Sequence, residues 1–195
     1  WSGSRPVEWL LENANLDQRW CVVHATHMTE GEVRALARTG AIAGLCPLSE
    51  ANLGDGIFEY ARYTDHGGAY GVGSDSNVEI NAPGELKQLE YSQRLKHHQR
   101  NIAPRCDGES TGRHLYERAL AGGARATGQK IGAIANGYRA DVVVLDRTHI
   151  DLVMLEDDRW LDSYVFVSAR SAIDRVIVGG RDLVIVGRHH ARDWI

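Results

Sequence analysis

Short apolar runs alternate with helical stretches along the N-terminal part of the chain. Residues 20–23, 41–46 and 69–73 are nearly continuous in apolar side chains, which is typical of strands buried on both faces of a parallel sheet. The intervening segments 29–40 and 57–66 have apolar residues at helical spacing. This order predicts consecutive βα units, in which each strand leads into a helix.

Cap and turn residues predict where some of these elements begin and end. Pro6 falls where a first helix would start. Thr29, followed three residues later by Glu32, is a capping-box pattern, and Gly40 stands where that helix would stop. Residues 47–56 are rich in Gly and polar side chains and are predicted to form a loop.

The hydrophobic pattern changes after Gly128. Helices are predicted over residues 84–95 and 113–127, and short β-rich runs follow them. These strands are predicted at residues 140–145, 165–167, 176–178 and 183–186, with a hairpin turn at Gly179-Gly180. We therefore expect an antiparallel layer separate from the βα units, and we divide the chain into residues 1–127 and 128–195.

Composition excludes several classes of function. The chain has 22 Lys and Arg against 26 Asp and Glu, a formal net charge of −4, and no basic run, so nothing indicates nucleic-acid binding. Its apolar runs are far shorter than the roughly 20 residues of a membrane span. The 3 cysteines form no paired motif, which favours a cytoplasmic protein without disulfides. Trp1 rather than Met opens the chain, so we expect further residues upstream.

Polar side chains follow each of the three predicted strands. His24 ends the first strand, Ser49 and Glu50 come after the second, and Asp75 comes after the third. The carboxyl ends of parallel strands are where α/β folds place active sites, and a carboxylate there can bind a metal and accept a proton from its water. Each residue also has a structural interpretation, His24 as an ordinary core or surface histidine and Asp75 as a turn former.

Other patterns of catalytic residues are missing from the sequence. It contains no Gly-x-Ser-x-Gly elbow and no complete dinucleotide fingerprint. His24 and His27 lack the spacing and the Glu of a His-Glu-x-x-His zinc helix. The histidine pairs at 97–98 and 189–190 lie in polar stretches, so we expect both pairs on the surface.

The strand-end segments 24–29, 49–58 and 73–77, in this order and spacing, resemble the amidohydrolase superfamily. Its members are metal-dependent hydrolases and deaminases on a (β/α)₈ barrel with a small β-sandwich domain. Segments 132–146 and 174–181 are similar to the superfamily's return into the small domain and its closing hairpin. The resemblance implies an α/β fold, namely the C-terminal part of a (β/α)₈ TIM-type barrel plus part of a small β-sandwich domain.

Within the superfamily, these segments and residues 5–11 are most similar to the formimidoylglutamate deiminases. These enzymes convert N-formimino-L-glutamate into N-formyl-L-glutamate and ammonia in histidine degradation. Residues 50–58 carry most of the specificity, whereas Leu48 stands where the family has a small hydroxyl residue. Two alternatives stay open: another deaminase or a chlorohydrolase of the guanine, cytosine or adenosyl type, and a non-catalytic remnant or assembly subunit.

The resemblance also assigns roles to four residues. His24 matches a histidine that contacts the metal-bound hydroxide, and Asp75 matches a metal ligand that also accepts a proton. Glu50 and Asn52 match the segment that faces the substrate. The implied cofactor is one divalent metal ion, Zn²⁺, and the implied partner is a small-molecule substrate.

The family's first-strand His-x-His pair, and its fifth-strand His followed three residues later by Glu, have no counterpart in this sequence. We therefore expect three strands of the eight, completed by the missing N-terminal part of the barrel, in a homodimer. One carboxylate and one histidine fall short of the three protein ligands of a catalytic zinc. The chain alone is predicted to have little or no activity.

Overall fold

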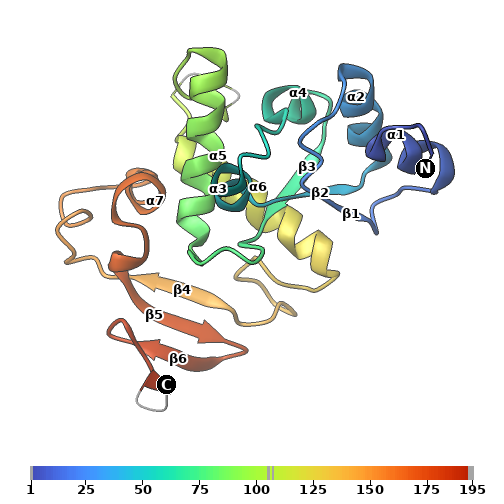
Figure 1. The fold of residues 1–195 in the computed structure, drawn as a ribbon. Coiled ribbons are helices and arrows are strands. Elements are labelled where there is room, and N and C mark those ends of the chain that lie inside the picture. Colours follow the sequence, from blue (N-terminus) through green and yellow to red (C-terminus); the bar gives the residue numbers. More distant parts are fainter. Residues whose placement is uncertain (1, 105, 107, 193–195) are drawn as a thin grey trace.

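The computed structural model describes residues 2–104, 106 and 108–192 of the chain. Trp1, on which the expectation of upstream residues rests, lies outside them. The described residues form a parallel sheet, an antiparallel sheet and the helices that pack beside them (Figure 1). The helices of the N-terminal part are α1 (Pro6–Asn13), α2 (Glu30–Thr39), α3 (Pro47–Leu53), α4 (Tyr60–Asp65), α5 (Ala82–His97) and α6 (Thr111–Thr127).

The parallel sheet confirms the strand and helix alternation predicted from the apolar runs. Its strands are β1 (Cys21–Val23), β2 (Ile42–Leu45) and β3 (Ala69–Val72). They lie in the order β1-β2-β3, and all of them run in the same direction. Val22 pairs with Ala43, and Ala43 pairs with Tyr70, so these three residues form one row across the sheet.

The predicted capping box of α2 is present and also joins α2 to α1. The Thr29 hydroxyl accepts from the Glu32 N–H at 3.3 Å, and the Glu32 carboxylate accepts from the Thr29 N–H at 2.6 Å. The same carboxylate accepts from Arg5 Nε at 2.9 Å and from the Glu8 N–H at 3.1 Å. The helix ends at Gly40, whose φ of 79° is left-handed, as predicted.

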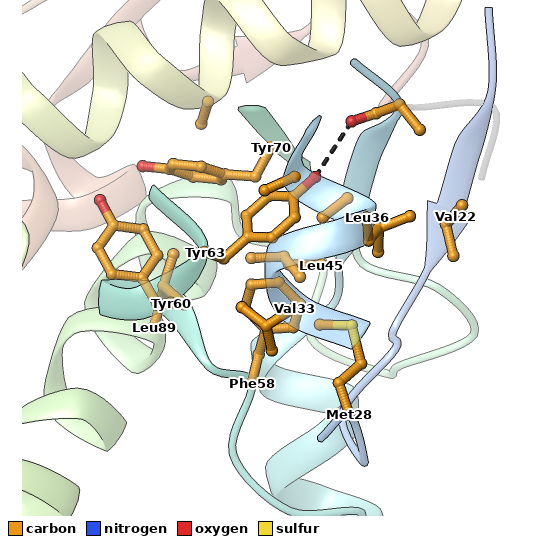
Figure 2. Packing of buried hydrophobic residues seen from close by; sticks show 14 of the residues in the cluster. Val22, Met28, Val33, Leu36, Leu45, Phe58, Tyr60, Tyr63, Tyr70 and Leu89 are labelled. Carbon is orange, nitrogen blue, oxygen red and sulfur yellow. Dashed lines mark hydrogen bonds between the residues drawn. The ribbon is translucent and has the colours of Figure 1, made fainter. Parts of the chain in front are cut away.

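The hydrophobic core lies between the sheet and the helices on one of its faces (Figure 2). Val33 and Leu36 of α2 are fully buried there. The rings of Phe58 and Tyr63 meet edge to face with centroids 5.3 Å apart. The Tyr63 hydroxyl donates to the Ala41 carbonyl at 3.1 Å, so this buried hydroxyl of α4 is satisfied by the backbone just before β2.

The other side of the edge strand β1 is poorly covered. On this side of β1, Val23 is 54% exposed. Trp20, just before the strand, is 41% exposed. The total exposed area is 12082 Å², against the roughly 9,200 Å² expected of a compact protein of this mass. The chain thus exposes apolar surface of a kind that folded domains normally cover.

The C-terminal part forms an antiparallel sheet of its own (Figure 1). Its strands are β4 (Val142–Leu145), β5 (Ile173–Val178), β6 (Arg181–Ile185) and β7 (Arg188–His189), in that order. The hairpin between β5 and β6 turns at Gly179 and Gly180, both with positive φ, as predicted. None of the residues in these four strands is buried. Both faces of the sheet are therefore at least partly open to solvent.

Residues 165–167, which were predicted to form a strand, are helical. The segments there are α7 (Arg159–Ser163), the π-helical turn η1 (Tyr164–Ser168) and the 3₁₀ turn η2 (Ala169–Ala172). Tyr164 meets Tyr116 of α6 edge to face at 6.2 Å, and Phe166 stacks on Tyr91 of α5 at 5.8 Å. Packing against two helices overrides the β propensity of this aromatic and β-branched run.

Residues 47–56, which were predicted to be a loop, begin with helix α3. Pro47 occupies its first position, where the missing N–H of proline does no harm. Gly54 ends it with a φ of 73° and donates its N–H to the Glu50 carbonyl. Only the stretch from Gly54 to Glu59 is without a helix or strand. The prediction of a loop was wrong for residues 47–53, where Pro at the start and Gly at the end are typical helix boundaries.

Helix α6 approaches strand β3 so closely that a side chain at Gly122 has no space. A Cβ built there would lie 1.7 Å from the Tyr70 carbonyl oxygen, whereas one built at Gly123 meets nothing within 4 Å. The two neighbouring glycines are therefore a matched pair, one at the contact and one facing open space.

We predict that Gly122→Ala lowers the free energy of unfolding by about 3 kcal/mol, because the backbones must separate. Gly123→Ala should instead raise it by up to about 1 kcal/mol, because alanine favours the helix. Urea unfolding of the two variants measures both changes. Equal effects at the two positions would contradict the close approach.

Candidate active site

The carboxyl ends of β1, β2 and β3 bring three of the predicted site residues together. His24 follows β1, Glu50 lies on α3 after β2, and Asp75 follows β3. The distance from His24 Nδ1 to Glu50 Oε1 is 3.2 Å, and that from His24 Nε2 to Asp75 Oδ2 is 3.7 Å. The histidine ring therefore lies between two carboxyl groups at the edge where α/β folds carry chemistry.

The backbone at this edge takes an uncommon conformation. His24, Ala25 and Asp75 have φ values of 63°, 49° and 52°, in the left-handed region that residues other than glycine rarely adopt. The sheet stabilises the first of them, because the His24 N–H donates to the Gly44 carbonyl at 2.8 Å. Such backbone strain is concentrated at functional sites, where it directs side chains.

The three side chains differ in their access to solvent. His24 is 38% exposed and Asp75 is 39% exposed, whereas the Glu50 side chain is only 5% exposed. Glu50 Oε1 also accepts the Cys46 N–H at 2.9 Å. His24 and Asp75 thus face the open side of the edge, and Glu50 lies behind the histidine.

Asn52, the fourth predicted residue, is exposed on the same helix as Glu50. Two positions along a helix correspond to roughly 200° of rotation, so the two side chains leave α3 in different directions. In the described part of the chain no hydrogen bond joins Asn52 to His24 or Asp75. Its predicted contact with substrate stays a prediction.

Sequence reasoning missed Glu85 of α5, because a single Glu in an amphipathic helix gives no signal of burial. Its Oε2 accepts the Leu48 N–H at 2.8 Å, which holds the first turn of α3, and the residue is 1% exposed. Burial, together with the negative charges of Glu50 and Glu79, raises the pKa of the Glu85 carboxyl to about 7, although the hydrogen bond from the Leu48 N–H lowers it. A titrating group therefore lies behind the α3 segment that carries Glu50.

Cys46 lies in the same region as a buried thiol. Burial, together with the nearby carboxyl groups of Glu50, Asp75 and Glu85, raises the pKa of this thiol to about 11. A thiol with this pKa stays protonated at neutral pH in the metal-free chain, which makes it a poor nucleophile.

His24 Nε2 and Asp75 Oδ2 are the donors that fit a metal ion. An imidazole nitrogen and a carboxylate oxygen on one side of an open edge are ligand types that Zn²⁺ prefers. Among the residues that the structure describes, no three His, Cys, Asp or Glu gather in a group that could hold a metal. The edge thus offers two donor atoms of these types.

The two histidine pairs lie where the sequence predicted, except that His97 is half-buried: His98, His189 and His190 are exposed. His27 is exposed as well. Within the described residues, no helix is both long enough and apolar enough to cross a membrane.

Comparison with known proteins identifies both the family and a specific relative. The model of the amidohydrolase family matches residues 3–183. A formimidoylglutamate deiminase of Pseudomonas aeruginosa is 50% identical over 189 residues, which cover 97% of this chain and 42% of the relative.

Solved structures agree with the fold described above. An amidohydrolase from Brucella melitensis matches with a TM-score of 0.91 at 45% identity, over 100% of this chain and 42% of that one. An adenosine deaminase from Xanthomonas campestris, solved with bound zinc, matches with a TM-score of 0.83 at 22% identity, over 96% and 42% of the two chains. The predicted α/β class, part of a TIM-type barrel with an antiparallel layer, is confirmed. The chain spans about two fifths of the length of these proteins.

Glu85 gives a testable dependence of stability on pH. Its carboxyl group binds a proton more tightly when folded, at a pKa of about 7, than an ordinary Glu does, so its contribution to stability is complete at acidic pH and is lost as the pH rises through 7. Between pH 5 and pH 8 we expect a loss of about 2 kcal/mol from this group.

The control is Glu85→Gln, whose amide oxygen can still accept the Leu48 N–H but does not ionise. Urea unfolding at both pH values should show a smaller loss in this variant than in the parent chain. Equal losses in the two proteins would show that Glu85 does not titrate in this range.

Proposed function

This chain belongs to the amidohydrolase family, and on that basis we propose that it forms the catalytic edge of a formimidoylglutamate deiminase. The reaction adds water to the formimino carbon of N-formimino-L-glutamate and releases ammonia, which leaves N-formyl-L-glutamate. The observation that supports this substrate best is the 50% identity to the Pseudomonas aeruginosa enzyme over 97% of the chain.

In this proposal His24 and Asp75 act on the open side of the edge. When bound, a divalent ion such as Zn²⁺ would lower the pKa of its water to about 7. Asp75, whose Oδ2 lies at the opening beside His24 Nε2, would hold the ion through its carboxylate and accept a proton. His24 directs Nε2 to the same opening and orients the attacking water. Electrostatic and acid–base catalysis of this kind needs no covalent intermediate.

The remaining parts of the site must come from outside this chain. Even if His24 is counted beside Asp75, a catalytic zinc is short of at least one protein ligand. The family's fifth-strand Glu, which would protonate the leaving nitrogen, has no counterpart in this sequence. We propose that the rest of the barrel supplies both and covers the open side of β1. We also propose that the whole protein is a homodimer in the cytoplasm. Within this chain, residues 1–127 and residues 128–195 form two separate units.

Two other functions predict different results. Another deaminase of the superfamily would release ammonia from guanine or cytosine rather than from N-formimino-L-glutamate. A non-catalytic assembly subunit would keep its function after His24 and Asp75 are replaced. Substrate choice and site variants therefore separate the three.

We predict that His24→Ala and Asp75→Asn each lower kcat/KM by about 10³-fold or more, since each removes a group from the reacting centre. The assay is ammonia release from N-formimino-L-glutamate by a chimaera in which this chain replaces the matching part of the Pseudomonas aeruginosa relative. His27→Ala, which changes an exposed histidine three residues away, is the control and should keep full activity. Activity that survives both site variants would refute the enzyme proposal.

Metal content gives a second prediction. The chain alone should retain well below one zinc ion after dialysis, because its edge offers two donors, whereas the chimaera should retain about one. Elemental analysis of both proteins measures the difference. A stoichiometric, tightly held zinc in the chain alone would mean that its own residues complete the site.

A further inference from the structure

Glu50 makes contacts that a residue facing the substrate would not need. Its Oε1 lies 2.9 Å from the Cys46 nitrogen and 3.2 Å from His24 Nδ1, and its side chain is 5% exposed. A carboxylate can only accept hydrogen bonds, and the Cys46 N–H can only donate. The same oxygen therefore favours a proton on His24 Nδ1, because a nitrogen lone pair facing it would be repelled.

We propose that Glu50 is a positioning residue that holds His24 as the Nδ1–H tautomer and directs its Nε2 lone pair toward the opening beside Asp75. Its catalytic consequence rests on the proposed function, but the tautomer itself does not. A histidine ring has two distinct nitrogens, and the hydrogen bond made by one of them decides what the other can do.

The acceptor is fixed in place from several sides. Glu50 lies on α3, whose first turn is held by the hydrogen bond from the Leu48 N–H to Glu85 Oε2 at 2.8 Å. The Ser49 hydroxyl donates to the Ser74 carbonyl at 3.1 Å, which joins α3 to the segment that carries Asp75. These contacts hold the Glu50 oxygen in position, and the half-exposed ring of His24 is oriented by its contact with that oxygen.

The opposite side of the ring has no comparable restraint. The 3.7 Å between His24 Nε2 and Asp75 Oδ2 is longer than a hydrogen bond. With the proton on Nδ1, Nε2 and the Asp75 carboxylate present two acceptors to one opening. Two acceptors at one opening suit a cation or a proton donor such as water. Rotation of the imidazole ring by 180° would move Nε2 away from the opening and remove one of them.

Nitrogen-15 spectroscopy of the 195-residue chain tests the tautomer without any catalysis. In the parent chain, the neutral form of His24 should carry its proton on Nδ1 rather than on Nε2. Glu50→Ala should shift His24 toward the Nε2–H tautomer that free imidazole side chains favour. Glu59→Ala, which removes a partly exposed carboxyl paired with Lys96, is the control and should leave the His24 signals unchanged.

Glu50→Gln keeps the test decisive if the alanine variant fails to fold. Its amide oxygen can accept from both donors, so a folded Glu50→Gln chain should retain the Nδ1–H tautomer. An Nε2–H tautomer in the parent chain, or in folded Glu50→Gln, would overturn the proposal. An unchanged tautomer in folded Glu50→Ala would overturn it as well.

The chimaera separates this inference from the proposed function. Glu50→Ala should lower kcat by about 10–100-fold with little change in KM, the size expected when a residue that orients a site group is lost. Glu50→Gln should recover most of the activity. If the chimaera does not hydrolyse N-formimino-L-glutamate but Glu50→Ala changes the His24 tautomer, the proposed function is refuted and the positioning role is supported. If hydrolysis proceeds but Glu50→Ala leaves the tautomer unchanged, only the positioning role is refuted.

Discussion

The parallel pairing of β1, β2 and β3 is the constraint on which the rest of the structure depends. Because the three strands run in one direction, His24, the start of α3 and Asp75 all arrive at the same edge, although about fifty residues separate the first from the last. The row formed by Val22, Ala43 and Tyr70 faces the helices and fixes the register. A change of register by one residue would turn the buried row outward and disperse the site.

The three carboxyl groups at this edge differ in how deeply they are buried, and their burial decides which groups each can contact. Asp75 is open to solvent and can meet a metal or a proton donor directly. Glu50 is buried one layer deeper and meets the histidine, and Glu85 is buried deeper still and meets the backbone of α3. Glu85 thus holds the backbone of α3, Glu50 on that helix contacts His24, and Asp75 lies on the other side of the histidine ring.

The elements of the parallel sheet could be predicted because their signals are local. Continuous apolar runs indicate buried strands, and Thr29, Glu32 and Gly40 mark the ends of α2 through contacts with near neighbours. The helical turn at Tyr164 could not be predicted, since its conformation is set by rings on α5 and α6. The same holds for the site: strand ends locate His24 and Asp75, whereas the burial of Glu50 and Glu85 arises only from tertiary packing.

The left-handed backbone at His24, Ala25 and Asp75 sets the stability of the fold against the orientation of the side chains. Each such residue costs of order 1–3 kcal/mol, against a net stability of about 5–15 kcal/mol for a typical domain. Glycine at these positions would relieve that cost, but it would remove the side chains of His24 and Asp75 and loosen the turn that orients the imidazole. Under the proposed function, selection for thermal resistance and selection for turnover would act in opposite directions on the same few torsion angles.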